Sequence, residues 1–168
     1  MSEPISAEAK LFIRISCHRM CDHYLPKLVR AAEAIDERAL WETEDGHEQS
    51  IGGILMHVCE HVRRNGRRYR ERDLAFQAGI EQHFPQENCS TESMVGIVRD
   101  TFQAWREALF ELERLDEEET HRLYHLVEHT SYHLGQIVDR AQRISRTRFQ
   151  FVQNGLNERQ LRESMRSE

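Results

Sequence analysis

Histidine is the residue type whose number and spacing in this sequence most clearly suggest chemistry. The chain has 168 residues, and 10 of them are histidines. Two runs repeat histidine every four residues: His57 and His61 in one, and His121, His125, His129 and His133 in the other. Side chains four residues apart share one side of an α-helix, and two histidines at this spacing bind one metal ion in the HExxH helix. Because neutral imidazole is also the most common metal ligand among side chains, the two runs predict a metal site.

A site built from both runs would combine two imidazoles from one helix with a third from a facing helix. Helical bundles commonly build metal sites from side chains on facing helices. Three protein ligands leave one coordination position for water or substrate, which is the arrangement of catalytic rather than structural zinc. The alternative interpretation is that these histidines are ordinary residues of exposed helix faces.

Helix geometry ranks the candidate ligands. At about 100° per residue, the second run lies beside an apolar face that includes Leu123. His133 borders this face and His129 is one step further out, while the two earlier histidines point progressively toward solvent. We therefore predict that His129 and His133 are ligands. His57 and His61 both flank the apolar stripe of their own segment, and periodicity does not choose between them.

Four amphipathic segments must position these residues. Apolar residues recur at helical spacing in four stretches, which cover approximately residues 7–35, 51–69, 94–112 and 117–144. Pro26 predicts a kink or a division of the first stretch, and Ser50 is a suitable N-cap for the second. Asp116 and Glu119 have the spacing of a capping box at the start of the fourth. The economical way to bury four apolar faces is an all-α fold, a four-helix bundle.

The bundle is expected to form one metal-binding domain over residues 1–145, followed by a C-terminal tail over residues 146–168. Within the tail, Asn157–Arg166 is interpreted as a short helix or a frayed end. The stretch Gly79–Ser90 contains proline and asparagine and is interpreted as a connection between helices.

Composition excludes several classes of protein. With only 3 prolines and 8 glycines, the chain is neither collagen-like nor of low complexity. A net charge of −6 argues against nucleic acid or an acidic membrane as a partner. No run of apolar residues is long enough for a membrane span. The 4 cysteines, without a secretory leader, lead us to expect free thiols and a cytoplasmic protein.

Six arginines between residues 63 and 72 form the strongest local concentration of charge. Such a cluster could hold an anionic cofactor or nucleic-acid phosphates. We favour a solvated helix face whose arginines pair with nearby glutamates and aspartates.

Two stretches of the sequence resemble DinB-like (YfiT-like) proteins. Residues 123–138, LYHLVEHTSYHLGQIV, resemble the last core helix of these four-helix bundles. Within them, Glu128–Ile137 follows the pattern EHxSYHxGQI of a subfamily of unknown function. Ser50–His57, SIGGILMH, is similar to the opening of the family's second helix, SIGxxxxH. The resemblance covers most of residues 8–145 and leaves out the tail.

The resemblance implies a divalent metal, often zinc or nickel, bound by one histidine of the second helix and two of the last. Carried over position by position, these ligands are His57, His129 and His133. The resemblance thus selects His57 over His61. His61 stands where the subfamily more often has asparagine, so we interpret it either as a partner of a ligand or as a rival ligand.

Some members of the wider superfamily are transferases or isomerases that use a low-molecular-weight thiol. A thiol with a pKa of about 8.5 is mostly protonated at neutral pH, and a metal ion holds it as the nucleophilic thiolate. The resemblance therefore implies a metal-dependent, thiol-dependent transferase that acts on a small molecule and forms a homodimer. The alternatives are a hydrolase that uses a metal-bound water and a non-enzymatic bundle that binds a partner or a structural ion. Glu60 and Glu128 are candidate general bases by proximity in the sequence alone.

Overall fold

The computed structural model of the chain describes residues 5–43, 48–71, 74–151 and 157–165. Its elements follow in this order: α1 (Ala7–Cys17), the π-helix η1 (His18–Tyr24), α2 (Leu25–Glu33), α3 (Glu37–Trp41), α4 (Ile51–Arg70), the 3-10 helix η2 (Ile80–Gln82), α5 (Thr91–Phe110), α6 (Glu117–Ser145) and α7 (Glu158–Ser164). These residues include no strand, so the prediction of an all-helical chain is confirmed for them.

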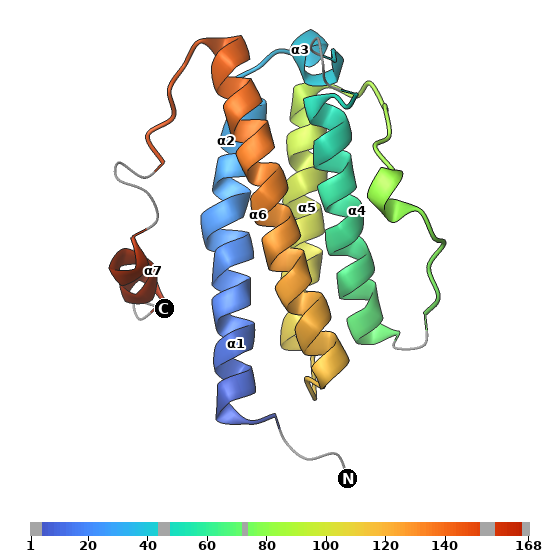
Figure 1. The fold of residues 1–168 in the computed structure, drawn as a ribbon, viewed down its shortest axis with the longest axis vertical. Helices are drawn as coiled ribbons and strands as arrows, with labels where there is room; N and C mark the ends of the chain where they lie inside the picture. Colours follow the sequence, from blue (N-terminus) through green and yellow to red (C-terminus); the bar gives the residue numbers. More distant parts are fainter. Residues whose placement is uncertain (1–4, 44–47, 72–73, 152–156, 166–168) are drawn as a thin grey trace.

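The long helices lie side by side. In Figure 1, α1 and α2 run end to end, and α4, α5 and α6 lie alongside them. α4 packs against both α5 and α6, and α2 packs against the same two helices. Side chains of all these helices meet in one core, in which Leu28, Leu55, Phe102 and Leu123 are fully buried. Because α4 and α6 are direct neighbours, the two histidine runs lie on adjoining helices.

Polar side chains fix where the two histidine-bearing helices begin. Ser50 is the N-cap of α4, and its Oγ accepts a hydrogen bond from the Gly53 N–H at 2.9 Å. Asp116 and Glu119 form the capping box of α6, in which each side chain accepts from the other residue's backbone N–H. Both predicted helix starts are confirmed. The caps satisfy N–H groups that have no partner inside the helix.

The beginning of α4 is also packed tightly against the indole of Trp41. A Cβ atom at Gly52 would lie 2.6 Å from Trp41 Cε3, which is too close for any larger residue. The Trp41 Nε1–H donates to the Cys89 carbonyl at 2.7 Å. The indole therefore links α3, the start of α4 and the segment before α5.

The expected interruption of the first helical stretch takes the form of a π-helix. α1 ends at Cys17, η1 covers His18–Tyr24, and α2 begins at Leu25. Pro26 lies in the first turn of α2, directly after the π-helix, so its missing N–H falls at the junction of the two helices. The wider turn before the proline lets the chain continue in one direction instead of bending away.

Beyond α6, which ends at Ser145, α7 lies against the first helical stretch. The Arg14 Nη2 group donates to the Met165 carbonyl at 3.3 Å, and Ser164 Oγ lies 2.9 Å from His18 Nε2. α7 falls within the stretch for which a short helix or a frayed end was expected. The division of the chain into a domain and a tail stays a prediction.

None of the helices among the described residues combines the length and the apolar character that crossing a bilayer requires.

Candidate metal centre

Imidazole rings from α4 and α6 converge at one point between the two helices. His57 Nε2 lies 3.1 Å from His129 Nε2, and His133 Nε2 lies 3.2 Å from the same nitrogen. The His57 side chain is 1% exposed and that of His133 is 6% exposed. The structure therefore brings together the three residues that the resemblance selects as ligands.

The outer nitrogens of two rings determine which tautomer each ring adopts. His57 Nδ1 lies 3.0 Å from the His83 carbonyl oxygen, and His133 Nδ1 lies 2.8 Å from Gln136 Oε1. Gln136 Nε2 donates to the Tyr132 hydroxyl at 3.1 Å, and Oε1 is the amide atom that faces His133. Both oxygens can only accept, so both Nδ1 atoms carry hydrogen and both Nε2 atoms present a lone pair.

This arrangement of lone pairs fits a cation. His129 Nε2 faces the lone pairs of His57 and His133, and it can donate a hydrogen to only one of them. At least one close N···N pair therefore has no hydrogen to form a hydrogen bond, whereas a cation between the rings would accept all three lone pairs. The other nitrogen of His129, Nδ1, is buried and has no hydrogen-bond partner among the residues that the structure describes. Neutral imidazoles held in a fixed tautomer by a carbonyl oxygen are what metal sites in proteins use.

The electrostatics of the cluster keep its histidines neutral. Burial, together with the neighbouring histidines, lowers the pKa of His61 and of His129 to about 3. Burial also lowers the pKa of His57 and of His133. At neutral pH all four rings therefore offer lone pairs, which is the form that binds metal.

His61 and Glu81 extend the cluster beyond the three predicted ligands. His61 Nε2 lies 3.9 Å from Glu81 Oε1, and His129 Nε2 lies 3.9 Å from Glu81 Oε2. The ligand atoms of His57, His61, Glu81 and His129 all lie within 4.8 Å of one another, so this group could hold a metal ion. His61 was left open as a rival ligand. Glu81 could not be recognised from the sequence. It lies in the connection between α4 and α5, where no periodic pattern or motif marks it as a ligand.

The connection that carries Glu81 is held against α4 near the start of that helix. Phe84 stacks on the His57 ring, with centroids 4.2 Å apart and planes inclined by 21°. Gln86 Nε2 donates to Ser50 Oγ at 2.9 Å. These contacts add to the hydrogen bond between His57 and the His83 carbonyl, so this segment fixes the orientation of the His57 ring.

Arginines of α4 hold the other end of the same connection. The guanidinium groups of Arg64, Arg67 and Arg68 lie over the Phe76 ring, 5.2, 5.6 and 4.8 Å from its centroid. Arg64 Nη1 also donates to the Gln77 carbonyl at 2.8 Å. η2, with Glu81, therefore lies between two anchored segments.

The structure accounts for the described members of the arginine cluster in terms of local pairing. Arg63 and Arg64 form ion pairs with Glu60 at 2.8 and 2.7 Å, and Arg70 pairs with Glu111 at 2.8 Å. These pairs agree with the interpretation of a solvated face, and Arg72 lies outside the described residues.

The two candidate general bases differ from Glu81 in what they contact. The Glu60 carboxylate is engaged by its two arginines, and Glu128 is exposed. The carboxylate that the structure brings to the imidazoles is that of Glu81.

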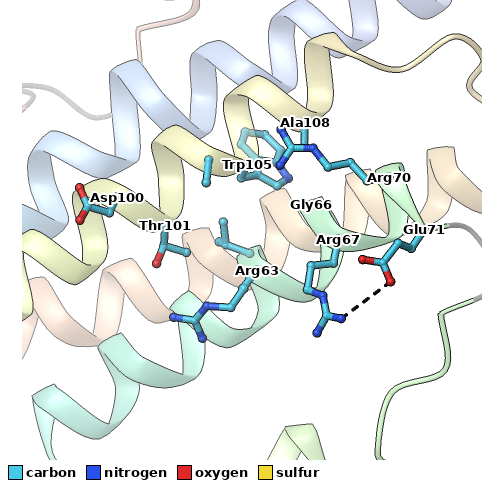
Figure 2. A pocket seen from close by; sticks show the side chains of 11 residues that line it. Arg63, Gly66, Arg67, Arg70, Glu71, Asp100, Thr101, Trp105 and Ala108 are labelled. Carbon is cyan, nitrogen blue, oxygen red and sulfur yellow. Dashed lines mark ion pairs between the residues drawn. The ribbon is translucent and has the colours of Figure 1, made fainter.

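A pocket of about 360 Å³ lies between α4 and α5, separate from the histidine cluster. Figure 2 shows Arg63, Arg67 and Arg70 around it, with Gly66 and Trp105 among the other residues that line it. No histidine lines the pocket. Trp105 is 1% exposed, so its indole is a core side chain that forms part of the pocket wall. The chemistry of the described residues therefore points to the histidine cluster.

The stability of the metal-free protein is expected to fall on acidification. His61 and His129 titrate at a pKa of about 3 when folded, against a usual value of 6.5. Between these values the unfolded chain binds more protons, so the free energy of unfolding decreases as pH falls from 6.5 toward 3. Urea unfolding with a chelator, at about pH 7 and about pH 5, measures this slope. The His61→Gln variant should show a smaller slope, and an equal slope would contradict the assignment.

Removing the amide that orients His133 is expected to weaken metal binding. In Gln136→Leu, His133 Nδ1 loses its acceptor and the ring is free to change tautomer, which should raise the Kd for Zn²⁺ by about 10–100-fold. Tyr132→Phe is the matched control, since it removes only the hydroxyl behind Gln136 and should change the Kd far less. Competition with a chromophoric chelator measures both constants. Equal affinities in Gln136→Leu and in the unmodified protein would show that Gln136 does not support the site.

Comparison with known proteins gives no independent assignment. Neither family models, curated proteins nor solved structures gave a match to this chain. The resemblance to DinB-like proteins therefore stays a prediction that depends on the histidine motifs. The evidence for function is the close approach of the Nε2 atoms of His57, His129 and His133.

Proposed function

We propose that this chain is a metal-dependent enzyme of the DinB-like four-helix-bundle type, with a divalent cation held by His57, His129 and His133. The observation that carries this proposal is the convergence of three Nε2 atoms at 3.1 and 3.2 Å. The Nδ1 atoms of two of these rings are held by acceptors. Imidazole ligands suit zinc and nickel.

Thiol-dependent transfer to a small-molecule substrate is the reaction class that we propose first. A bound divalent cation would hold a low-molecular-weight thiol as its thiolate at neutral pH. The His83 carbonyl and Gln136 keep the ligand rings oriented, and Phe84 covers one face of His57. The exposed Glu81 carboxylate lies 3.9 Å from His129 Nε2 and is placed to accept the proton that the thiol loses.

Hydrolysis is the second candidate, and the position of Glu81 favours it. A carboxylate beside a three-histidine centre can accept a proton from a water molecule as readily as from a thiol. The third candidate, a non-enzymatic bundle with a structural ion, would require His61 and Glu81 to close the coordination shell. These alternatives share the same metal centre and differ in whether a position stays open for substrate.

Metal analysis and a substrate screen test the proposal together. Protein purified without chelator should carry a stoichiometric divalent metal, and chelation should lower its Tm. Thiol cofactors should then be screened against ester and amide substrates with the metal-loaded protein. Turnover that requires added thiol supports transfer, and turnover without thiol supports hydrolysis. Protein without metal, whose Tm is unchanged when metal is added, would contradict the proposal.

We also propose that the protein is a homodimer, as the resemblance implies, and that it is cytoplasmic, as its cysteine usage led us to expect. Tyr124 and Tyr132 on α6 are 54% and 65% exposed and offer aromatic surface for such an interface. Sedimentation at the mass of a single 19.9 kDa chain would contradict the dimer.

A further inference from the structure

We infer that the histidine cluster binds a second divalent cation beside the first, held by His61, His125 and Glu81. This inference goes beyond the three-histidine centre and rests on the proposed function for the first cation. The side chains that carry it come from α4, α6 and η2.

The first observation is that the cluster holds more donors than one ion needs. Five imidazoles form a continuous row, in which the ring centroids of His57 and His61 are 4.6 Å apart and those of His129 and His133 are 4.5 Å apart. His125 continues the row, 5.6 Å from His129. A tetrahedral ion takes four ligands, and a centre with an open position takes only three from the protein. His61, His125 and Glu81 are therefore not needed as ligands of the first ion.

The second observation is that His61 has a buried nitrogen with no partner. The His61 side chain is 9% exposed, and its Nε2 atom has no hydrogen bond to any part of the chain that the structure describes. A buried polar atom without a partner is costly. Among the described residues, the closest charged group recorded for this nitrogen is the Glu81 carboxylate, at 3.9 Å. A separation of 3.9 Å is too long for a hydrogen bond, but a cation between the two groups would bond to both.

The third observation is the way in which Glu81 spans the cluster. Oε1 faces His61 Nε2 and Oε2 faces His129 Nε2, each at 3.9 Å. One carboxylate oxygen is thus directed to the predicted first centre and the other to His61. Carboxylates that bridge in this way join the ions of two-metal sites, which lie about 3.5–4 Å apart.

The helices place the donors of the two centres at successive positions along the contact between α4 and α6. Four residues of α-helix rise about 6 Å, so each run of histidines moves its donors by one turn along that contact. His57 meets His129 and His133 at the first of these positions. His61 lies 3.9 Å from the His129 ring centroid and 6.4 Å from that of His125 at the next.

The test is a titration of the metal-free full-length protein with Zn²⁺, followed by calorimetry, and with Co²⁺, followed by its visible spectrum. The unmodified protein should bind two equivalents per chain. His61→Gln should bind one equivalent, with the affinity of the remaining site retained. Glu81→Gln should also bind one equivalent, with a weaker remaining site because the bridging oxygen is lost. His121→Ala, which changes an exposed histidine of the same run, is the matched control and should bind two.

The outcomes separate this inference from the proposed function. If the unmodified protein binds no cation, both the second site and the proposed function are wrong. One equivalent in the unmodified protein, whether or not His61→Gln weakens it, would end this inference and leave the first centre in place. Two equivalents in both variants would show that other residues hold the second ion and would also overturn the inference. Glu81 is exposed, so Glu81→Gln should fold, and helicity by circular dichroism checks that His61→Gln does so as well.

Discussion

Replacing His129 with alanine is expected to remove the cation proposed to be held by His57, His129 and His133. His129 Nε2 is the nitrogen that lies within 3.2 Å of both His57 Nε2 and His133 Nε2, so it is the centre of the three-histidine group. Loss of a residue that only orients a ligand costs about 10–100-fold in affinity, and loss of the ligand itself should exceed that range. The increase in Tm caused by added metal should become smaller, because this cation no longer stabilises the folded state. Metal analysis and thermal unfolding measure the two effects.

The His121→Ala variant is the matched control for this result. It removes an imidazole from the same helix at an exposed position two turns before His129. Its metal content and metal-dependent Tm should equal those of the unmodified protein. If both variants keep full metal content, the ions are bound elsewhere and the proposed centre is wrong.

Replacing Trp105 with alanine is expected to give the largest loss of stability. The indole is 1% exposed, packs beside Gly66 of α4 and donates from Nε1 to Asn65 Oδ1 at 2.8 Å. Truncation of a buried tryptophan costs about 3–5 kcal/mol. The Asn65 amide oxygen is then left without this partner inside the protein, which adds to the cost. Urea unfolding measures the change in the free energy of unfolding.

Phe110→Ala serves as the comparison, because it removes another aromatic ring from α5 at a position that is 56% exposed. A surface change of this kind should alter the free energy of unfolding by no more than about 0.5 kcal/mol. If the two variants were equally stable, the α4–α5 contact around Trp105 would not be part of the core.

The helix starts could be predicted because their determinants are local. Ser50 bonds to a backbone group three residues ahead, and Asp116 and Glu119 bond to each other across the same interval. Such contacts can be predicted from the types of the residues and the interval between them. The π-helix η1 has no comparable signal. Its extra backbone spacing depends on how α1 and α2 pack against other helices, and Pro26 shows only that some irregularity occurs nearby.

The site could be predicted where its members share a helix. His129 and His133 lie one turn apart beside an apolar face, so their proximity follows from geometry alone. The choice between His57 and His61 could not be made in this way, and the structure brings both rings to the cluster. Glu81 reaches the cluster through the path of the connection between α4 and α5. That path depends on Phe76 and Phe84 meeting α4, which periodicity does not reveal.

The hydrogen bond from His57 to the His83 carbonyl shows that two parts of the chain build the site: the helices α4 and α6, and the connection that follows α4. The helices contribute the nitrogen donors, and the connection after α4 sets the angle at which one of them is presented. Sequence changes in that connection could retune metal preference or substrate access while the helical frame keeps its stability. Related chains with the same histidines could therefore diverge in chemistry through this short segment alone.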